Sequence, residues 1–140
     1  MIILDTNVLS ALMLLRPDTT VADWLDRQPH TSVWTCSVTV FEIRSGLQSM
    51  PAGNRRSQRS AAYESLLSEI IGQRIAPFDH SAAERAAGIF AERQKRGRPG
   101  ELRDTMIAGI VLASHATLAT RNVKHFDDIA SSVVNPWVKG

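Results

Sequence analysis

Three carboxylates, those of Asp5, Glu42 and Asp104, stand at points of the sequence where a metal site could form. Asp5 comes directly after the apolar run IIL, and Glu42 lies early in a helical pattern that follows a second apolar run. Asp104 lies near the start of another helical pattern, and Asn122 follows a later apolar run. In open parallel sheets, sites form beyond the carboxyl ends of the strands, where the loops converge. We therefore expect these polar residues to meet at one edge of a sheet.

Three carboxylates gathered at one edge need positive charge beside them. Two such charges at close range repel by several kcal/mol at an effective dielectric constant of about 20, so either a cation binds or some of the acids stay protonated. A hard divalent cation, Mg²⁺ or Mn²⁺ as its substitute, suits a set of oxygen ligands and takes its remaining ligands from water and a substrate phosphate. Such an ion activates water and polarises a phosphoryl oxygen. This chemistry indicates hydrolysis of a phosphodiester bond.

Each acid taken alone also has an ordinary explanation. Asp5 could be a turn residue or the N-cap of the helix that follows it, and Glu42 lies off the apolar stripe of its helix and could be plain surface charge. Asp104 could simply complement the positive end of its helix. It precedes Ile107 and Ala108 by three and four residues, however, so its carboxylate is expected on their inward face. The joint placement of the acids is what favours a site.

The elements expected to position these residues alternate between short apolar strands and amphipathic helices. Strands are predicted at 2–4, 32–37, 74–78, 117–120 and 132–137, the last ended by Pro136. Helices are predicted at 8–15, 21–27, 38–50, 61–72, 81–95 and 102–115, with Gly72 closing the fourth and Ser81 capping the fifth. The Pro, Gly, Asn and Ser content of 51–60 predicts a loop. The alternation indicates an α/β fold, a three-layer α/β/α sandwich around a central parallel sheet.

Composition indicates one globular domain, residues 1–140, with 44% hydrophobic and 21% charged residues. The single Cys36 excludes an intramolecular disulfide, and the four histidines lack the paired spacing of a zinc site. The apolar segments are shorter than the roughly 20 residues of a membrane-spanning helix, and the N-terminus lacks the pattern of a signal peptide. We therefore expect a cytoplasmic protein with no membrane anchor.

The basic residues are bunched although the formal net charge is only +2. They form two clusters along the chain: Arg55, Arg56 and Arg59, then Arg93, Lys95, Arg96, Arg98 and Arg103. Each cluster could be a solvated surface, or it could contact phosphate groups of a nucleic acid.

At these residues the sequence resembles the PIN-domain family, and within it the VapC toxins of toxin-antitoxin modules, especially the FitB-like branch. The resemblance rests on segments that cover essentially the whole chain in order: MIILDTNVLS, TVFEIRSGL, ELRDTMIAGIVLASHATLATRNVKHF and the terminal VVNPW. It implies metal-binding acids at Asp5, Glu42 and Asp104. It also matches Thr120 to a hydroxyl residue that helps to hold the site.

One position departs from the family pattern. The family often has a fourth acid where this chain has Asn122, and an amide can offer an oxygen but no charge. A weaker or single-metal site follows as a prediction. Glu101, one helical turn before Asp104, could supply the missing charge or could be a solvated first-turn glutamate. The resemblance also matches Thr6 and Asn7 to the polar positions beside the first acid.

The partners that the resemblance implies are RNA, a second copy of the chain and a small antitoxin. The expected activity is that of an endoribonuclease acting on structured RNA, frequently tRNA or rRNA, as a homodimer. The antitoxin's tail would fill the acidic groove, commonly with an arginine, which is a sensible plug for a cation site, and would join the toxin on operator DNA. The neighbourhoods of Arg55 and Arg98 are the candidate phosphate contacts.

Two other functions compete with this interpretation. A phosphoryl-transfer domain, such as a receiver or an aspartyl phosphatase, fits poorly, because the phosphatase type needs an aspartate two residues after the first and this chain has Asn7 there. A catalytically weak PIN-like module that acts with an antitoxin in operator DNA binding stays open because of Asn122.

Overall fold

The computed structural model describes residues 1–138, and the predicted domain of 1–140 extends two residues beyond them. Five strands form one parallel sheet in the order β3-β2-β1-β4-β5. In chain order they are β1 (Ile2–Leu4), β2 (Val33–Cys36), β3 (Ile75–Ala76), β4 (Thr117–Ala119) and β5 (Val133–Val134). In the register of the central pair, Leu4 lies beside Ala119, so the residues after these two strands leave the sheet side by side.

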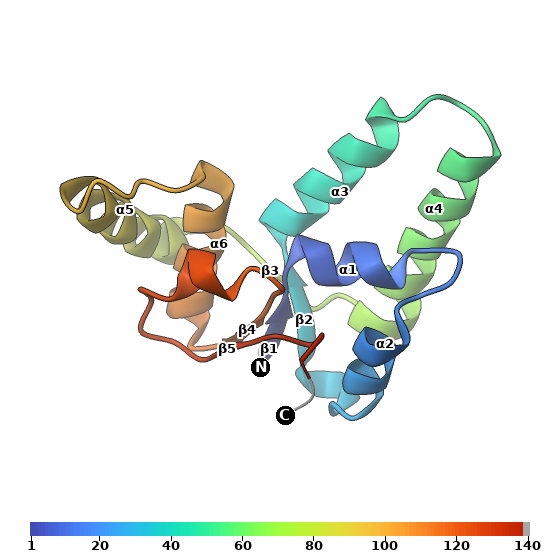
Figure 1. The fold of residues 1–140 in the computed structure, drawn as a ribbon, viewed down its shortest axis with the longest axis horizontal. Helices are drawn as coiled ribbons and strands as arrows, with labels where there is room; N and C mark the ends of the chain where they lie inside the picture. The colour runs from blue at the N-terminus through green and yellow to red at the C-terminus, as the bar shows by residue number, and fades with distance from the viewer. Residues whose placement is uncertain (139–140) are drawn as a thin grey trace.

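Helices cover both faces of the sheet (Figure 1). The α-helices within the described residues are α1 (Thr6–Leu12), α2 (Thr19–Asp26), α3 (Ser37–Ser49), α4 (Asn54–Ser65), α5 (His80–Lys95) and α6 (Leu102–Ser114). Shorter helical segments are η1 (His30–Ser32), the π-helical η2 (Leu66–Ile71) and η3 (Val123–Phe126). Helices α1 to α4 lie on one side of the sheet and α5 and α6 on the other, which confirms the predicted three-layer α/β/α fold.

Alternating side chains of the strands pack into two separate hydrophobic cores, one on each face of the sheet. Leu4 and Val33 point to one face and pack with α1 to α4 and η2. Ile3 and Leu118 are paired in the register, point to the other face and pack with α5 and α6. Because successive residues of a strand point to opposite faces, three-residue strands suffice to anchor both layers. None of the helices within residues 1–138 has the length and apolar character that crossing a bilayer requires.

The predicted loop at 51–60 is wrong from Asn54 onward, because α4 begins there. Gly53, at a φ of 153°, precedes the helix and lets the chain turn into it. The first two turns of α4 are rich in Arg, Gln and Ser, and Tyr63 is the buried residue of the helix. Arginine and glutamine are good helix formers, but a helix with so little buried surface shows no hydrophobic period in the sequence.

Several predicted ends also differ from the structure. Asp79, not Ser81, caps α5, since its carboxylate accepts a hydrogen bond of 3.0 Å from the Ala82 N–H. Helix α1 begins at Thr6 because Asp5 caps it, and α6 ends at Ser114 with His115 in the left-handed conformation. Strand β5 is only two residues long. The prediction that a helix closes at Gly72 is confirmed, with η2 as its last part.

Candidate active site

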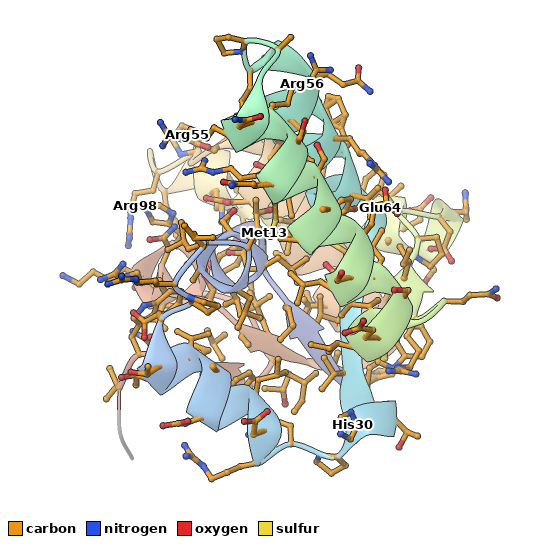
Figure 2. All side chains as sticks on the ribbon, turned by 90° about the vertical axis from the view of Figure 1, so that its right-hand side faces the viewer. Met13, His30, Arg55, Arg56, Glu64 and Arg98 are labelled. Atoms are coloured by element: carbon orange, nitrogen blue, oxygen red, sulfur yellow. The ribbon has the colours of Figure 1, made fainter. Side chains whose placement is uncertain are left out.

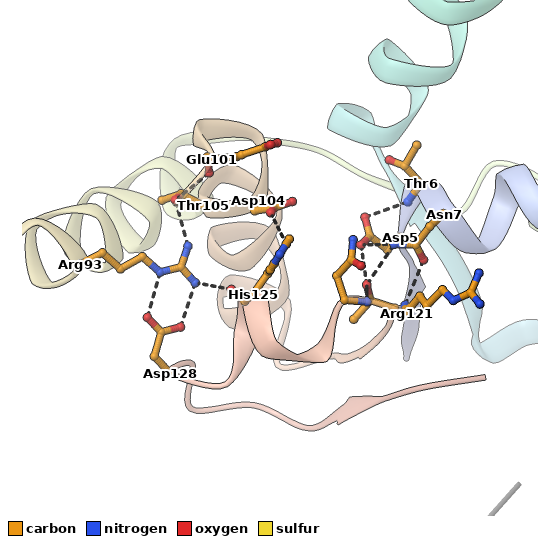
Figure 3. A network of polar contacts seen from close by, with 12 residues as sticks. Asp5, Thr6, Asn7, Arg93, Glu101, Asp104, Thr105, Arg121, His125 and Asp128 are labelled. Carbon is orange, nitrogen blue, oxygen red and sulfur yellow. Dashed lines mark hydrogen bonds and ion pairs between the residues drawn. The ribbon is translucent and has the colours of Figure 1, made fainter. Parts of the chain in front are cut away.

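Asp5 directly follows β1 and caps α1, so the ordinary capping role and a place at the sheet edge coincide. Its carboxylate accepts hydrogen bonds from the Thr6 N–H at 2.8 Å, from Thr120 Oγ1 at 2.7 Å and from Asn7 Nδ2 at 3.3 Å (Figure 3). Only 4% of the residue is exposed. Burial raises the pKa of this carboxyl, against the opposing effect of the hydrogen bonds from Thr120 and Thr6. Asp5 is therefore a fixed carboxylate that favours a positive neighbour.

Glu42 projects from α3 toward α1 and α6. One carboxylate oxygen accepts a hydrogen bond of 2.8 Å from Thr6 Oγ1, and the other lies 3.2 Å from Nη1 of Arg103. The side chain is 19% exposed, whereas that of Arg103 is 55% exposed. Glu42 thus lies beside the buried stripe of its helix in a half-buried position, not on the open surface that its place off the stripe suggested.

Asp104 lies in the first turn of α6, with its side chain 19% exposed. Its Oδ2 is 3.0 Å from Nδ1 of His125, which comes from η3 (Figure 3). Burial raises the pKa of the Asp104 carboxyl; His125 acts in the opposite direction, and the charges of Glu101 and Glu42 raise it further. The inward direction expected from its helical spacing is therefore what the structure has.

The three acids line one pocket of about 560 Å³ at the carboxyl end of the sheet, here called the acid pocket. Asn122 and Glu101 also line it, as the sequence predicted for residues near the acids. Thr120 is fully buried behind Asp5 and accepts a hydrogen bond of 3.1 Å from the Asn122 N–H. Helix α1, α3, α6 and the segment after β4 each contribute, which explains why residues so distant in sequence meet.

The acids share this pocket without touching one another. Within residues 1–138, no group of three Asp, Glu, His or Cys side chains is close enough to hold a metal ion as the side chains stand. Each carboxylate is turned to a partner of its own: Thr120 and Asn7 for Asp5, Arg103 for Glu42, and His125 for Asp104. The donor set itself, carboxylates with amide and hydroxyl oxygens, fits a hard divalent cation. Of the internal partners, Arg103 and His125 are exposed side chains that can rotate away, so an ion could replace them.

The sequence did not indicate two partners of the acids: His125, which lines the pocket, and Arg103, which contacts Glu42. The sequence pattern presents His125 as one of four histidines without zinc-site spacing and Arg103 as part of a basic cluster. A signal was available for the first, because His125 lies five residues after Thr120, in the short helix that follows the strand end. Their pairing with Asp104 and Glu42 depends on side-chain directions that spacing alone does not give.

The second basic cluster divides into buried and exposed members. Arg93 is 4% exposed and bonds to Asp128, Thr105 and the His125 carbonyl, so it is part of the framework and not a solvated charge. Arg98 lines a second hollow, of about 330 Å³, that shares Glu101, Asp104 and His125 with the acid pocket. Arg55 is an exposed residue at the start of α4 (Figure 2).

Comparison with known proteins agrees with this architecture over nearly the whole chain. The PIN domain model matches residues 2–131. VapC ribonuclease Y4jK of Sinorhizobium fredii is 34% identical over 137 residues, covering 98% of this chain and 98% of that protein. Toxin FitB of Neisseria gonorrhoeae is 31% identical over 137 residues, covering 98% and 99%. A chain from the structure of FitAB bound to an IR36 DNA fragment matches with a TM-score of 0.89 and 30% identity, covering 100% of this chain and 98% of that one. The chain belongs to the PIN-domain family, and its similarity within that family is to VapC and FitB toxins.

Proposed function

We propose that this protein is a metal-dependent endoribonuclease toxin that hydrolyses phosphodiester bonds of RNA and is neutralised by a cognate antitoxin. The observation that carries the proposal is the acid pocket, where Asp5, Glu42 and Asp104 converge from three different helices or helix ends. The similarity to a VapC ribonuclease and to toxin FitB over 98% of the chain supports the same activity. The proposed place of action is the cytoplasm, where RNA is present.

Asp5, Glu42 and Asp104 are the proposed ligands of Mg²⁺, with Mn²⁺ as a substitute. When bound, the ion would supply an activated water and polarise the phosphoryl oxygen under attack. Thr120 and Asn7 hold the Asp5 carboxylate in one orientation, so this ligand needs no rearrangement. Glu42 and Asp104, which contact Arg103 and His125 in this structure, would hold the cation in place of these partners. Asn122 offers a neutral oxygen at the pocket wall, which favours a weaker site or a single ion.

The antitoxin is proposed to neutralise the toxin by occupying the acid pocket. Arg103 and His125 already show that a guanidinium and an imidazole satisfy these carboxylates, so an arginine from a partner's tail would bind there by the same charge-assisted hydrogen bonds. Operator DNA would be reached through the antitoxin, as the DNA-bound structure of FitAB suggests by similarity. A homodimer and phosphate contacts through Arg98 and Arg55 complete the proposed set of partners.

A catalytically weak binding module is the second candidate. The feature that favours it is the absence of a fourth carboxylate at Asn122, together with the contacts of Arg103 and His125 with two of the three acids. Such a module would keep the acid pocket as the seat of the antitoxin and act in operator DNA binding. It would bind its antitoxin tightly but leave RNA intact.

Purified protein without antitoxin tests the proposal directly. We expect it to cleave RNA in Mg²⁺ or Mn²⁺ and to stop in EDTA, and we expect Asp104→Asn to lower the rate by about 100-fold or more, because a metal ligand supplies several kcal/mol of transition-state stabilisation. Asp23→Asn, an exposed acid of α2 outside the pocket, is the matched control. Cleavage that persists in EDTA would overturn the metal-dependent mechanism. Intact RNA under all metals and substrates would favour the binding module.

Expression in cells gives an independent readout. We expect the unsubstituted protein to arrest growth, and Asp5→Asn and Asp104→Asn each to relieve the arrest while the protein stays folded. Toxicity that survives both substitutions would remove these acids from the proposed mechanism.

A further inference from the structure

Arg121 occupies a special place in the acid pocket. Within residues 1–138 it is the one lysine or arginine among the residues that line this pocket. Its backbone N–H donates a hydrogen bond of 3.1 Å to Asn7 Oδ1, so its backbone is tied to the residue that also bonds to Asp5. In Figure 3 its guanidinium points away from Asp104 and His125.

The guanidinium of Arg121 lies over an aromatic ring. Its central carbon lies 4.9 Å from the centroid of the Trp137 ring, which also lines the pocket. Trp137 is anchored in turn, because its backbone N–H donates a 2.9 Å hydrogen bond to Asn135 Oδ1 and its side chain packs against the core that includes Leu4. Trp137, near the end of the described residues, thus places an aromatic ring beside the acid pocket at the carboxyl end of the sheet.

Arg121 has no carboxylate partner among the described residues, in contrast to Arg103 and Arg93. Arg103 is paired with Glu42 and Arg93 with Asp128, whereas Arg121 forms no salt bridge within 4.0 Å to any residue of 1–138. A guanidinium stacks on planar groups and is weakly hydrated, so it can carry a second planar group on its other face. Unpaired RNA bases are recognised by stacking on aromatic rings and on arginine planes.

We propose that Arg121, stacked on Trp137, binds an unpaired base of the RNA beside the scissile phosphate. The inference rests on the proposed nuclease function and adds to it a specific pair of residues that contacts a base of the substrate. The stacked pair gives the anionic pocket a contact that attracts RNA without neutralising the carboxylates. The positive charge of Arg121 would also attract the phosphate backbone of the RNA, which the acids repel.

Binding is measured in an Asp104→Asn background, so that the RNA stays intact, with a fluorescently labelled single-stranded RNA and the same sequence in a duplex. Base stacking is worth roughly a 5- to 100-fold change in affinity. We expect Arg121→Lys, which keeps the charge and loses the plane, to weaken single-strand binding within this range. Trp137→Leu should do the same, and Trp137→Phe should keep most of the affinity. Arg85→Lys, an exposed arginine of α5 in a different hollow, is the control and should change nothing.

An abasic nucleotide separates base stacking from a phosphate contact. If Arg121 stacks on a base, then RNA that carries abasic sites at the bound position binds weakly, and Arg121→Lys adds no further loss. Full affinity of Arg121→Lys for normal RNA, or an equal loss for abasic RNA and duplex, would show a simple charge contact and overturn the proposal. Urea unfolding checks whether the Trp137→Leu protein is folded. If it is not, the binding data for Arg121→Lys alone test the proposal.

Cleavage kinetics distinguish a failure of base binding by Arg121 from a failure of the proposed nuclease function. With an active enzyme, Arg121→Lys should raise KM and leave kcat nearly unchanged, since the base lies beside the reacting phosphate and not on it. If the unsubstituted protein does not cleave RNA but the variants still differ in RNA binding, the proposed nuclease function is rejected and base binding by Arg121 and Trp137 is kept. If the unsubstituted protein cleaves RNA and Arg121→Lys has the same KM, only base binding by Arg121 and Trp137 is rejected.

Discussion

Arg93 and Asp128 form a two-point ion pair, with Nε 2.9 Å from Oδ2 and Nη2 2.8 Å from Oδ1. The same guanidinium donates to Thr105 Oγ1 at 3.1 Å and to the backbone carbonyl of His125 at 2.9 Å. Thr105 follows Asp104 in α6, and His125 is the partner of Asp104 (Figure 3). One buried side chain of α5 therefore fixes both segments that set the position of Asp104.

Removing one partner of this ion pair should destabilise the protein strongly. Asp128→Ala leaves a buried guanidinium unpaired, and we expect a loss of about 3–5 kcal/mol in the free energy of unfolding, measured in urea. The exposed pair Arg44–Glu64 is the matched control, and Glu64→Ala should cost less than about 1 kcal/mol. The double change Arg93→Met with Asp128→Leu should recover much of the loss. Equal effects at the buried and the exposed pair would contradict this role.

The close packing of α5 on α6 depends on Gly109. A Cβ atom at this position would lie 2.5 Å from the Ala82 carbonyl oxygen and 2.7 Å from the Ala86 Cβ, so the two helices would have to move apart. We expect Gly109→Ala to destabilise the fold by about 1–3 kcal/mol. Gly88→Ala, in α5 with nothing within 4 Å of the added atom, should instead stabilise it by about 0.5–1 kcal/mol. Thermal unfolding of the two variants distinguishes them, and a stabilised Gly109→Ala protein would contradict the packing.

The layer order could be predicted from the sequence because each strand is a short apolar run followed by a helical pattern. The N-cap of α5 is harder to predict, since Asp79 and Ser81 are both of residue types that cap helices well. Only the path of the chain into the helix selects Asp79. The first half of α4 was missed because Tyr63, late in the helix, is its buried residue. Hydrophobic periodicity reports burial, so it cannot reveal a helix that is mostly exposed.

That the acids line one pocket could likewise be predicted, because the segments that follow parallel strands converge at one edge of the sheet. What the sequence could not give is the state of each acid in the absence of an ion. The pairings of Asp104 with His125 and of Glu42 with Arg103 join residues 21 and 61 positions apart in the numbering. They depend on the turn of η3 and on rotamers of long side chains, which no local pattern specifies.

The raised pKa values of Asp5 and Asp104 predict how pH and metal act on stability. Burial holds both above the unfolded value of about 3.9, so the folded state binds these protons more tightly. Their contribution is present below the unfolded pKa and is lost as pH rises through the folded pKa. Each of these carboxyls that ionises as pH rises leaves the metal-free protein with a partly buried charge that a bound ion would offset. We expect Mg²⁺ to raise the stability by about 2.7 kcal/mol at 100 times its Kd, and to raise it less at pH 5.

The Asp104→Asn variant provides the control for this linkage. Its metal-free stability at pH 7.5 should fall little or rise, because one unfavourable charge is gone, and its response to Mg²⁺ should shrink. Differential scanning calorimetry with and without EDTA measures both. A full response to Mg²⁺ in this variant would show that the ion binds elsewhere.

Asn122 offers the sharpest test of how this pocket holds a cation. The residue lines the acid pocket, and its N–H is fixed to Thr120 Oγ1, so a carboxylate at the same position would face the same space. Asn122→Asp adds one charge with almost no change in shape, and a metal site gains affinity with each anionic oxygen ligand. We expect Mn²⁺ to bind about 10-fold more tightly in isothermal titration and RNA cleavage to need correspondingly less metal, a gain of about 1.4 kcal/mol. Asn54→Asp, at the exposed start of α4, should leave both unchanged. If Asn122→Asp binds metal no better, then its side chain lies outside the coordination sphere, and the missing acid does not limit the site.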